Sequence, residues 1–160
     1  MALRKPLVMN AGQIEQLQSG DTLDAAVSEV DVVSLTNNNA SPIVIGAPVY
    51  TDVASGVDLA QADASATIEV LGLVQAVSIA AAASGFIQTD GVLAATTTQW
   101  DAVAGTTGGL TPGAIYYLSE ATPGILTETA PTTGGQFVVR VGKAISTTEM
   151  EISISQPIKL

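Results

Sequence analysis

The 160-residue chain contains no cysteine and no histidine, and no lysine or arginine occurs between Lys5 and Arg140. Without His or Cys, neither a serine–histidine dyad nor a cysteine nucleophile can be built. The same absences exclude a disulfide framework and a thiolate zinc site. We therefore expect a protein that binds and holds a partner, with no catalytic residues, no cofactor and no resident metal.

Aromatic residues are also scarce, at 4% of the chain, although hydrophobic residues make up 47%. The apolar content is mostly Ala, Val, Ile and Leu. Each fully buried large aliphatic side chain contributes only about 1.5–3 kcal/mol, so a core of small residues is thin. One domain fits this length, and we expect it to gain stability as a homo-oligomer or a docked subunit.

The formal net charge of −10 counts against nucleic acid and anionic membranes as partners, because phosphate binding depends on Lys and Arg. The longest apolar run of interest, residues 79–83, is far shorter than the roughly 20 residues of a membrane span. The apolar stretch after Lys5 covers only residues 6–9, which is too short for a signal peptide. The sequence predicts a soluble protein that is not exported by a signal of its own.

Two regions differ in pattern. Residues 1–26 read as an extended arm, because Pro6 disfavours helix at the preceding residue, with one helical turn over residues 13–18. Residues 27–160 consist of short β-type runs separated by turn residues, which is typical of an all-β barrel or sandwich. The expected strands are 30–36, 43–45, 49–51, 66–79, 86–89, 92–94, 114–118, 125–127, 136–141 and 149–155.

Several local signals refine this prediction. Asp90-Gly91 lies between two apolar runs and predicts a type I′ hairpin that joins 86–89 to 92–94. Gly72 predicts a bulge or bend within 66–79. The alanine-rich stretch 77–83 is the one helix candidate, but its shortness favours a strand edge or loop. Thr-Pro-Gly at 111–113 and again at 122–124 predicts tight turns.

The arm carries the strongest binding hypothesis. Arg4 and Lys5 stand beside the apolar strip Pro6, Leu7, Val8 and Met9 on an otherwise acidic molecule. This segment is either a loose terminus or a strand that docks on the edge of a partner sheet.

Three aromatic residues suggest further contacts. Trp100 is expected to be a core or edge anchor, with a subunit contact as the alternative. Tyr116 and Tyr117 are neighbours in a predicted strand and must point to opposite faces. One ring should fill the core, and the other, assigned to Tyr117, should be exposed or at an interface.

Other groupings carry weaker signals. Asp52, Asp58 and Asp63 share a loop-like segment and could supply oxygen ligands to Ca²⁺, but their spacing fits no calcium-loop motif, and an acidic surface loop is favoured. Lys143 and Ser146 read as a solvated turn rather than a catalytic dyad. Paired carboxylates could also form a glycosidase site, but no motif supports one, and this site is not favoured.

The leader at residues 5–23 (KPLVMNAGQIEQLQSGDTL) resembles the amino-terminal leader of several tailed-bacteriophage virion proteins. The remainder is similar to their small β-rich modules, in the segments 46–50 (GAPVY), 85–93 (GFIQTDGVL), 109–119 (GLTPGAIYYLS) and 142–146 (GKAIS).

The resemblance implies a head decoration, or cement, protein with a small β-barrel or β-tulip-like fold. Such a protein would be made in the host cytoplasm and sit as a homotrimer on the major capsid protein, at the outer surface of the virion. A tail-fibre or baseplate component is the alternative, because similar leaders occur there, and a secreted carbohydrate-binding module comes third. Fibres usually continue into a long repetitive part, whereas this sequence ends after its last strand, which favours the head.

Overall fold

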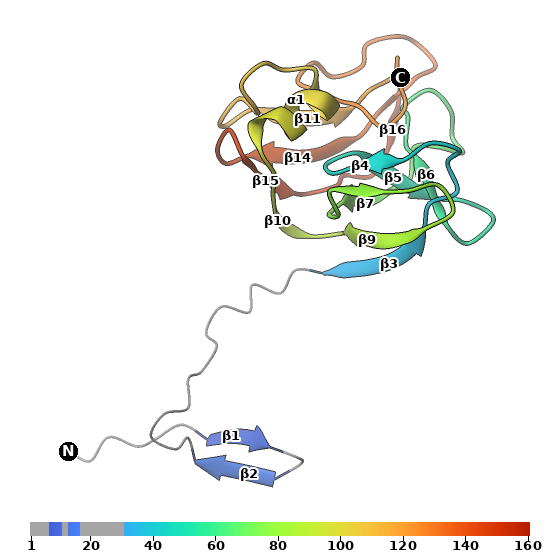
Figure 1. Cartoon of the computed structure of the whole chain (residues 1–160). Coiled ribbons are helices and arrows are strands. Elements are labelled where there is room, and N and C mark those ends of the chain that lie inside the picture. Colours follow the sequence, from blue (N-terminus) through green and yellow to red (C-terminus); the bar gives the residue numbers. More distant parts are fainter. Residues whose placement is uncertain (1–6, 11–12, 17–30) are drawn as a thin grey trace.

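The computed structural model describes residues 7–10, 13–16 and 31–160. Residues 31–160 form a body whose regular structure is antiparallel β-sheet joined by loops and turns, with a single short helix in that range (Figure 1). The all-β prediction is therefore confirmed. The predicted boundary between arm and body, at residues 26 and 27, lies outside the described residues.

The two N-terminal strands form a hairpin, in which β1 (Leu7–Asn10) pairs antiparallel with β2 (Gln13–Gln16). The extended conformation predicted for residues 7–9 is confirmed. The helical turn predicted over 13–18 is wrong for Gln13–Gln16, and residues 17 and 18 lie outside the described residues. Pairing with β1 satisfies the backbone of this segment, whereas a single helical turn carries the full cost of nucleation.

The first half of the body forms a five-stranded sheet in the order β3-β9-β7-β5-β6. Its strands are β3 (Val32–Thr36), β5 (Pro48–Thr51), β6 (Val57–Leu59), β7 (Val70–Val74) and β9 (Ser84–Gln88). A small two-stranded sheet, β4 (Ile43–Val44) with β8 (Ser78–Ile79), accompanies it.

The second half forms another five-stranded sheet in the order β10-β15-β14-β11-β12. Its strands are β10 (Gly91–Ala94), β11 (Ile115–Leu118), β12 (Leu126–Thr127), β14 (Arg140–Ala144) and β15 (Glu149–Ile152). β13 (Phe137–Val138) pairs with β16 (Ile158–Lys159) beside it.

One hydrophobic core draws on both sheets. Val49, Leu73 and Ile87 come from the first sheet and pack in the same cluster as Tyr116 and Met150 from the second. In β15 the side chains alternate between buried and exposed, as the sequence predicts. Each sheet therefore covers the apolar face of the other.

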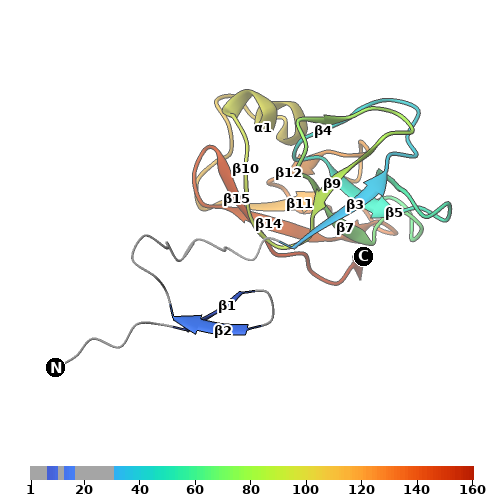
Figure 2. The ribbon, with the colours of Figure 1, turned by 60° about the horizontal axis from the view of Figure 1, so that its bottom comes forward.

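The hairpin predicted at Asp90-Gly91 is wrong. β9 pairs with β3 and β7, whereas β10 pairs with β15 in the other sheet, so the chain crosses between sheets here (Figure 2). Gly91 has a positive φ of 81°, but Asp90 does not, and a type I′ turn requires both. Instead, the Asp90 carboxylate accepts the Gly91 N–H at 2.7 Å.

The two halves also meet after β6. The Ala62 N–H donates to the Ser119 carbonyl at 2.9 Å, and the Phe137 N–H donates to the Ala62 carbonyl at 3.1 Å. The Gly124 N–H reaches back to the Ala60 carbonyl at 2.8 Å. Backbone bonds therefore join the halves at a place distant in sequence from the covalent crossing.

The helix α1 (Thr97–Ala104) is not predicted by the sequence patterns above. It begins with a capping box, in which the side chain of Thr96 and that of Gln99 each bond to the other's backbone N–H, and ends at Gly105 in the left-handed conformation. The stretch 77–83 is not helical: it contains β8 and a turn, as favoured from its length.

Two smaller predictions are confirmed. The pairing of β5 with β7 shifts register between Val49 and Tyr50, next to Gly72, and a Cβ atom at Gly72 would collide with the Gln88 carbonyl. Gly72 therefore leaves room for the β9 backbone beside the bulge, which a larger residue would not. In the turn at 111–113, the Ala114 N–H donates to the Thr111 carbonyl at 3.0 Å.

Candidate functional site

The docking residues proposed in the arm fall into two groups. Leu7, Val8 and Met9 form β1, where their Cα partners in β2 are Gln16, Glu15 and Ile14, whereas Arg4, Lys5 and Pro6 lie outside the described residues. An isolated two-stranded hairpin is only marginally stable in water and gains stability by pairing with further strands. Strand addition to a partner sheet stays a prediction for this segment.

Trp100 is not available as a docking residue. Its side chain projects from α1 and is fully buried in the core, and its Nε1–H donates to the Thr148 carbonyl at 3.0 Å. A Cβ atom at Gly46 would lie 2.9 Å from Cζ3 of this ring. Trp100 thus joins a loop of the first half to a loop of the second. The prediction that Trp100 is a core residue is confirmed, and the alternative prediction of a subunit contact is wrong.

The two adjacent tyrosines of β11 point to opposite faces of the sheet. Tyr116 is fully buried in the core, whereas Tyr117 is half-buried on the other side. Tyr117 has Arg140 and Thr127 as its cross-strand partners. It lies on the side of the second sheet that faces away from the core, so it is placed where a partner could reach it.

We call that side of the second sheet the outer face. Its side chains alternate with the core residues along β10, β15, β14 and β11. Its exposed or half-buried members include Val92, Ala94, Ile115, Tyr117, Arg140, Lys143, Ile145, Glu149 and Glu151. No strand or helix among the described residues pairs with or packs as a layer on this face.

At the centre of the outer face, four residues on adjacent strands form a row. Val92 lies opposite Glu151, Glu151 opposite Lys143, and Lys143 opposite Ile115. Val92 and Ile115, at the two ends of this row, are 40% and 37% exposed. Lys143 is one of only three basic residues in the body, together with Arg140 and Lys159.

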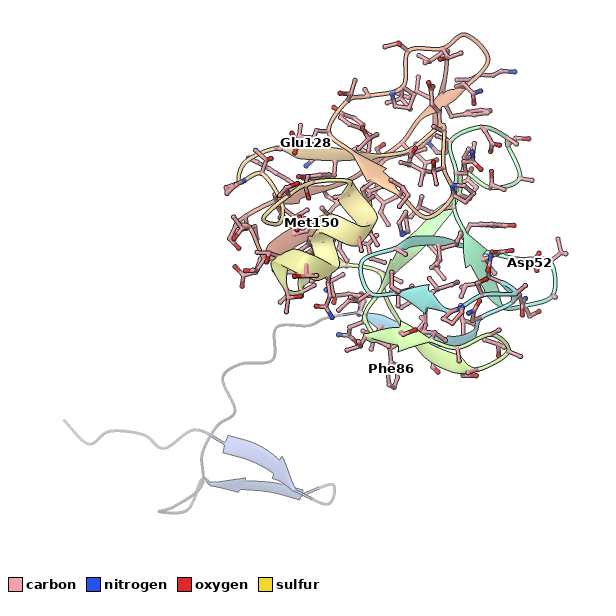
Figure 3. All side chains as sticks on the ribbon, turned by 45° about the horizontal axis from the view of Figure 1, so that its top comes forward. Asp52, Phe86, Glu128 and Met150 are labelled. Carbon is pink, nitrogen blue, oxygen red and sulfur yellow. The ribbon has the colours of Figure 1, made fainter. Side chains whose placement is uncertain are left out.

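A second accessible feature is the edge of the first sheet. Among the strands that the structure describes, β3 pairs with β9 alone. The bonds from Thr89 N–H to the Asp31 carbonyl and from Asn37 N–H to the Ala83 carbonyl set the register of this pairing. In an antiparallel ladder alternate residues face the partner, so the backbone groups of Val32, Ser34 and Thr36 point outward. Phe86 of β9, 54% exposed, projects from the body near this edge (Figure 3).

The three aspartates considered for calcium each accept hydrogen bonds from nearby protein groups. Asp52 accepts the Val53 N–H at 2.6 Å, and Asp58 accepts the Asn39 side-chain amide at 2.7 Å. Asp63 accepts the Thr67 hydroxyl at 3.2 Å. Within the described ranges no group of three or more acidic side chains is arranged to hold a metal ion. Asp52 and Asp63 therefore bond within their own loops, whereas Asp58, in β6, bonds to the side chain of Asn39.

The hydrogen-bonded carboxylates of the second half also serve loops. The Tyr116 hydroxyl donates to Glu128 Oε1 at 2.8 Å and accepts the Thr111 N–H at 3.0 Å. Burial is the main factor that raises the pKa of Tyr116, so this phenol stays protonated at neutral pH. Glu128, seen in Figure 3, also accepts the Thr111 hydroxyl at 2.7 Å. The cluster ties β11 to the loop after β12.

Asp101, in α1, organises the glycine-rich loop that follows the helix. Its carboxylate accepts the Gly109 N–H at 2.8 Å, the Gly108 N–H at 3.1 Å and the Thr106 hydroxyl at 3.1 Å. The bond from Gly109 is the largest factor that lowers the pKa of Asp101. The backbone N–H groups of these two glycines therefore bind a carboxylate of the protein itself, and this holds the loop against α1.

Comparison with protein-family models and with curated proteins identifies no relative. No protein-family model matches the chain, and no curated protein matches it at a significant level. Over the part of the chain described here, no helix has the length and apolar character needed to cross a membrane.

Sequence reasoning identified Tyr117 as a surface candidate but missed the rest of the outer face. The row from Val92 to Ile115 depends on the register of four strands, and two of its pairings join residues more than twenty positions apart. Only the alternation of Glu149, Met150 and Glu151 signalled in the sequence that one side of β15 would be exposed.

Proposed function

We propose that the chain is a non-catalytic structural protein of a tailed-phage virion that decorates and stabilises the assembled head. The proposal rests on the resemblance of residues 5–23 to the leaders of such virion proteins, in combination with an all-β body. The segments similar to phage β-rich modules fall on the body's strands and turns: 109–119 spans the Thr-Pro-Gly turn and β11, and 142–146 begins in β14.

The chemistry needed for this role is binding alone. A protein that binds the intact shell and not its dissociated parts stabilises the shell by mass action. In this proposal many trimers bind in symmetric positions on the major capsid protein. The contacts of each copy are modest, and their binding free energies sum over the shell. The acidic body keeps decorated particles mutually repelled and soluble.

The arm is the segment that we assign to docking on the capsid. Removal of residues 1–20 should abolish or strongly weaken binding to particles that lack this protein, measured by cosedimentation. Unchanged affinity would contradict docking through the arm. If Arg4 and Lys5 contact an acidic shell, the double variant R4Q/K5Q should bind with less dependence on salt concentration, and a dependence equal to that of the unchanged chain would argue against this contact.

Location and copy number test the function itself. Quantitative mass spectrometry of purified heads and tails should find this chain on heads, at a copy number close to that of the major capsid protein. Antibody labelling in electron micrographs gives an independent location. Absence from virions would contradict the proposal in every form.

A tail-fibre or baseplate component is the second candidate, because the same leader resemblance extends to tail proteins. That role requires only a few copies in each particle. Detection of the chain on isolated tails, with few copies and none on heads, would replace the first proposal by the second.

A further inference from the structure

The exposed row at the centre of the outer face has an order that is complementary to itself. Across four strands it reads Val92, Glu151, Lys143, Ile115: apolar, acidic, basic, apolar. All four side chains are exposed. Neighbouring strands lie about 4.8 Å apart, so these positions are evenly spaced.

A two-fold axis explains what such an order can recognise. We place the axis parallel to the strands, above the outer face and midway between β15 and β14. Rotation by a half turn about this axis places a second copy face to face with the first. Val92 of one copy then lies over Ile115 of the other, and Glu151 lies over Lys143. Every contact occurs twice, as in any isologous interface. Each copy brings an apolar residue to an apolar one and a carboxylate to an ammonium group.

The adjacent row of the face is compatible with the same operation. Ile145 lies opposite Glu149, since the Ile145 N–H donates to the Glu149 carbonyl at 2.9 Å, and Ala94 is the Cα partner of Glu149 on the other side. The half turn carries each row onto itself, so Glu149 of one copy meets Ile145 of the other. No like charges are brought together in either row.

We infer that the outer face is a two-fold contact surface for a second copy of this chain. The complementarity of charge and polarity selects this occupant over an unrelated partner. Because the charged pairs lie at the centre and the apolar pairs at the ends, the contact is salt-sensitive and modest in affinity. The inference does not depend on the proposed function, and a trimer would use a different, heterologous surface.

Sedimentation velocity of the full chain, at protein concentrations up to about 100 μM and at low and high salt, tests the contact in solution. The unchanged chain should associate reversibly into species with an even number of copies, and less so at high salt. K143E and E151K should each weaken self-association at least about tenfold, because each variant brings like charges together twice.

The decisive measurement mixes the two variants. K143E presents two carboxylates at the centre of the row, and E151K presents two ammonium groups. Each variant associates only weakly with itself, so an equimolar mixture should form dimers that contain one copy of each variant. The cross-strand pair within one copy is broken in both variants, so recovery on mixing can come only from contact between copies. K159E and E69K make the same changes of charge outside the face, and both should associate as the unchanged chain does.

Three results would overturn the inference: a monomer at every concentration, a trimer unaffected by either variant, or a mixture that stays dissociated. Circular dichroism and thermal unfolding establish that each variant is folded. If a charge variant fails to fold, V92T and I115T test the same surface at its apolar ends, and association equal to that of the unchanged chain would then contradict it. None of these results bears on whether the chain decorates a phage head.

Discussion

Tyr116 combines a ring buried in the core with a hydroxyl that bonds to the turn preceding its own strand. Replacement by Phe removes the acceptor of the Thr111 N–H and one donor to Glu128. We expect Y116F to lower the free energy of unfolding by about 1–2 kcal/mol, measured by urea denaturation.

The matched control is Tyr117→Phe on the same strand, where the ring is half-buried on the outer face. This change should alter stability by no more than about 0.5 kcal/mol. Equal losses in the two variants would show that the hydroxyl of Tyr116 does not stabilise the turn.

Asp101 makes the stability of the body depend on pH. Its folded-state pKa is lowered from an ordinary value of 3.8, chiefly by the Gly109 N–H. The carboxylate therefore contributes its full stability above pH 3.8 and loses it as the pH falls through the lower, folded-state pKa. D101N should melt below the unchanged chain at neutral pH, and the difference should shrink on acidification below about pH 4.

Thermal unfolding followed by circular dichroism across this pH range checks the prediction. D31N, which removes a charge from an exposed position just before β3, serves as the control and should lower the melting temperature less than D101N does at neutral pH. A difference between D101N and the unchanged chain that does not depend on pH would contradict the assignment.

Among the elements, α1 depends most visibly on its first residues. Thr96 caps the helix together with Gln99, and the helix is only eight residues long. T96A should cost about 1 kcal/mol in unfolding free energy. T98A, two residues further along at an exposed site in the helix, should be neutral or slightly stabilising because Ala is the better helix former.

Most of the β-strands could be predicted from the sequence because alternation of apolar and polar residues and frequent turn residues mark them directly. The exceptions are β6, in a segment read as a loop, β16, which was not predicted, and the predicted strand 66–79, which divides into β7 and β8. The helix was missed because residues 97–104 offer only a single turn of helical apolar spacing, Trp100, Val103 and Ala104 at i, i+3 and i+4. Its signals were the Thr96–Gln99 capping box and Gly105. At Asp90-Gly91 the sequence marks a place where the chain bends, but it does not say whether the next strand pairs with the previous one or with β15, because that choice depends on residues about sixty positions away.

The candidate surfaces show the same limit. That Tyr116 and Tyr117 face opposite ways follows from the two-residue period of a strand. Which of them is buried, and which side chains stand beside Tyr117, follows only from the pairing of β11 with β14, where the register also shifts. The burial of Trp100 depends on contacts with Gly46 and Thr148, each about fifty positions distant.

At the scale of the whole molecule, the described core lies entirely between Leu35 and Ile154. A chain that starts at Asp31 should therefore fold alone, with a melting temperature within about 4 °C of the full chain, the shift that ~1 kcal/mol produces in a domain of this size. Differential scanning calorimetry measures it.

A chain that starts at Asn37 lacks β3 as well and should be much less stable, because the five residues of that strand pair with β9. Comparable losses in both truncations would show that residues before Asp31 contribute to the fold of the body.

Each five-stranded sheet is built from one uninterrupted stretch of chain, residues 32–88 for the first and 91–152 for the second. A polypeptide split at the crossing near Asp90 would therefore yield two fragments, each with all the strands of one sheet but with no cover for its apolar side. Mixed together, the fragments should reassemble without a covalent link. The sole tryptophan would report the event, because Trp100 belongs to the second fragment while Gly46, against which its ring packs, belongs to the first, and its fluorescence should shift to shorter wavelength as the fragments join.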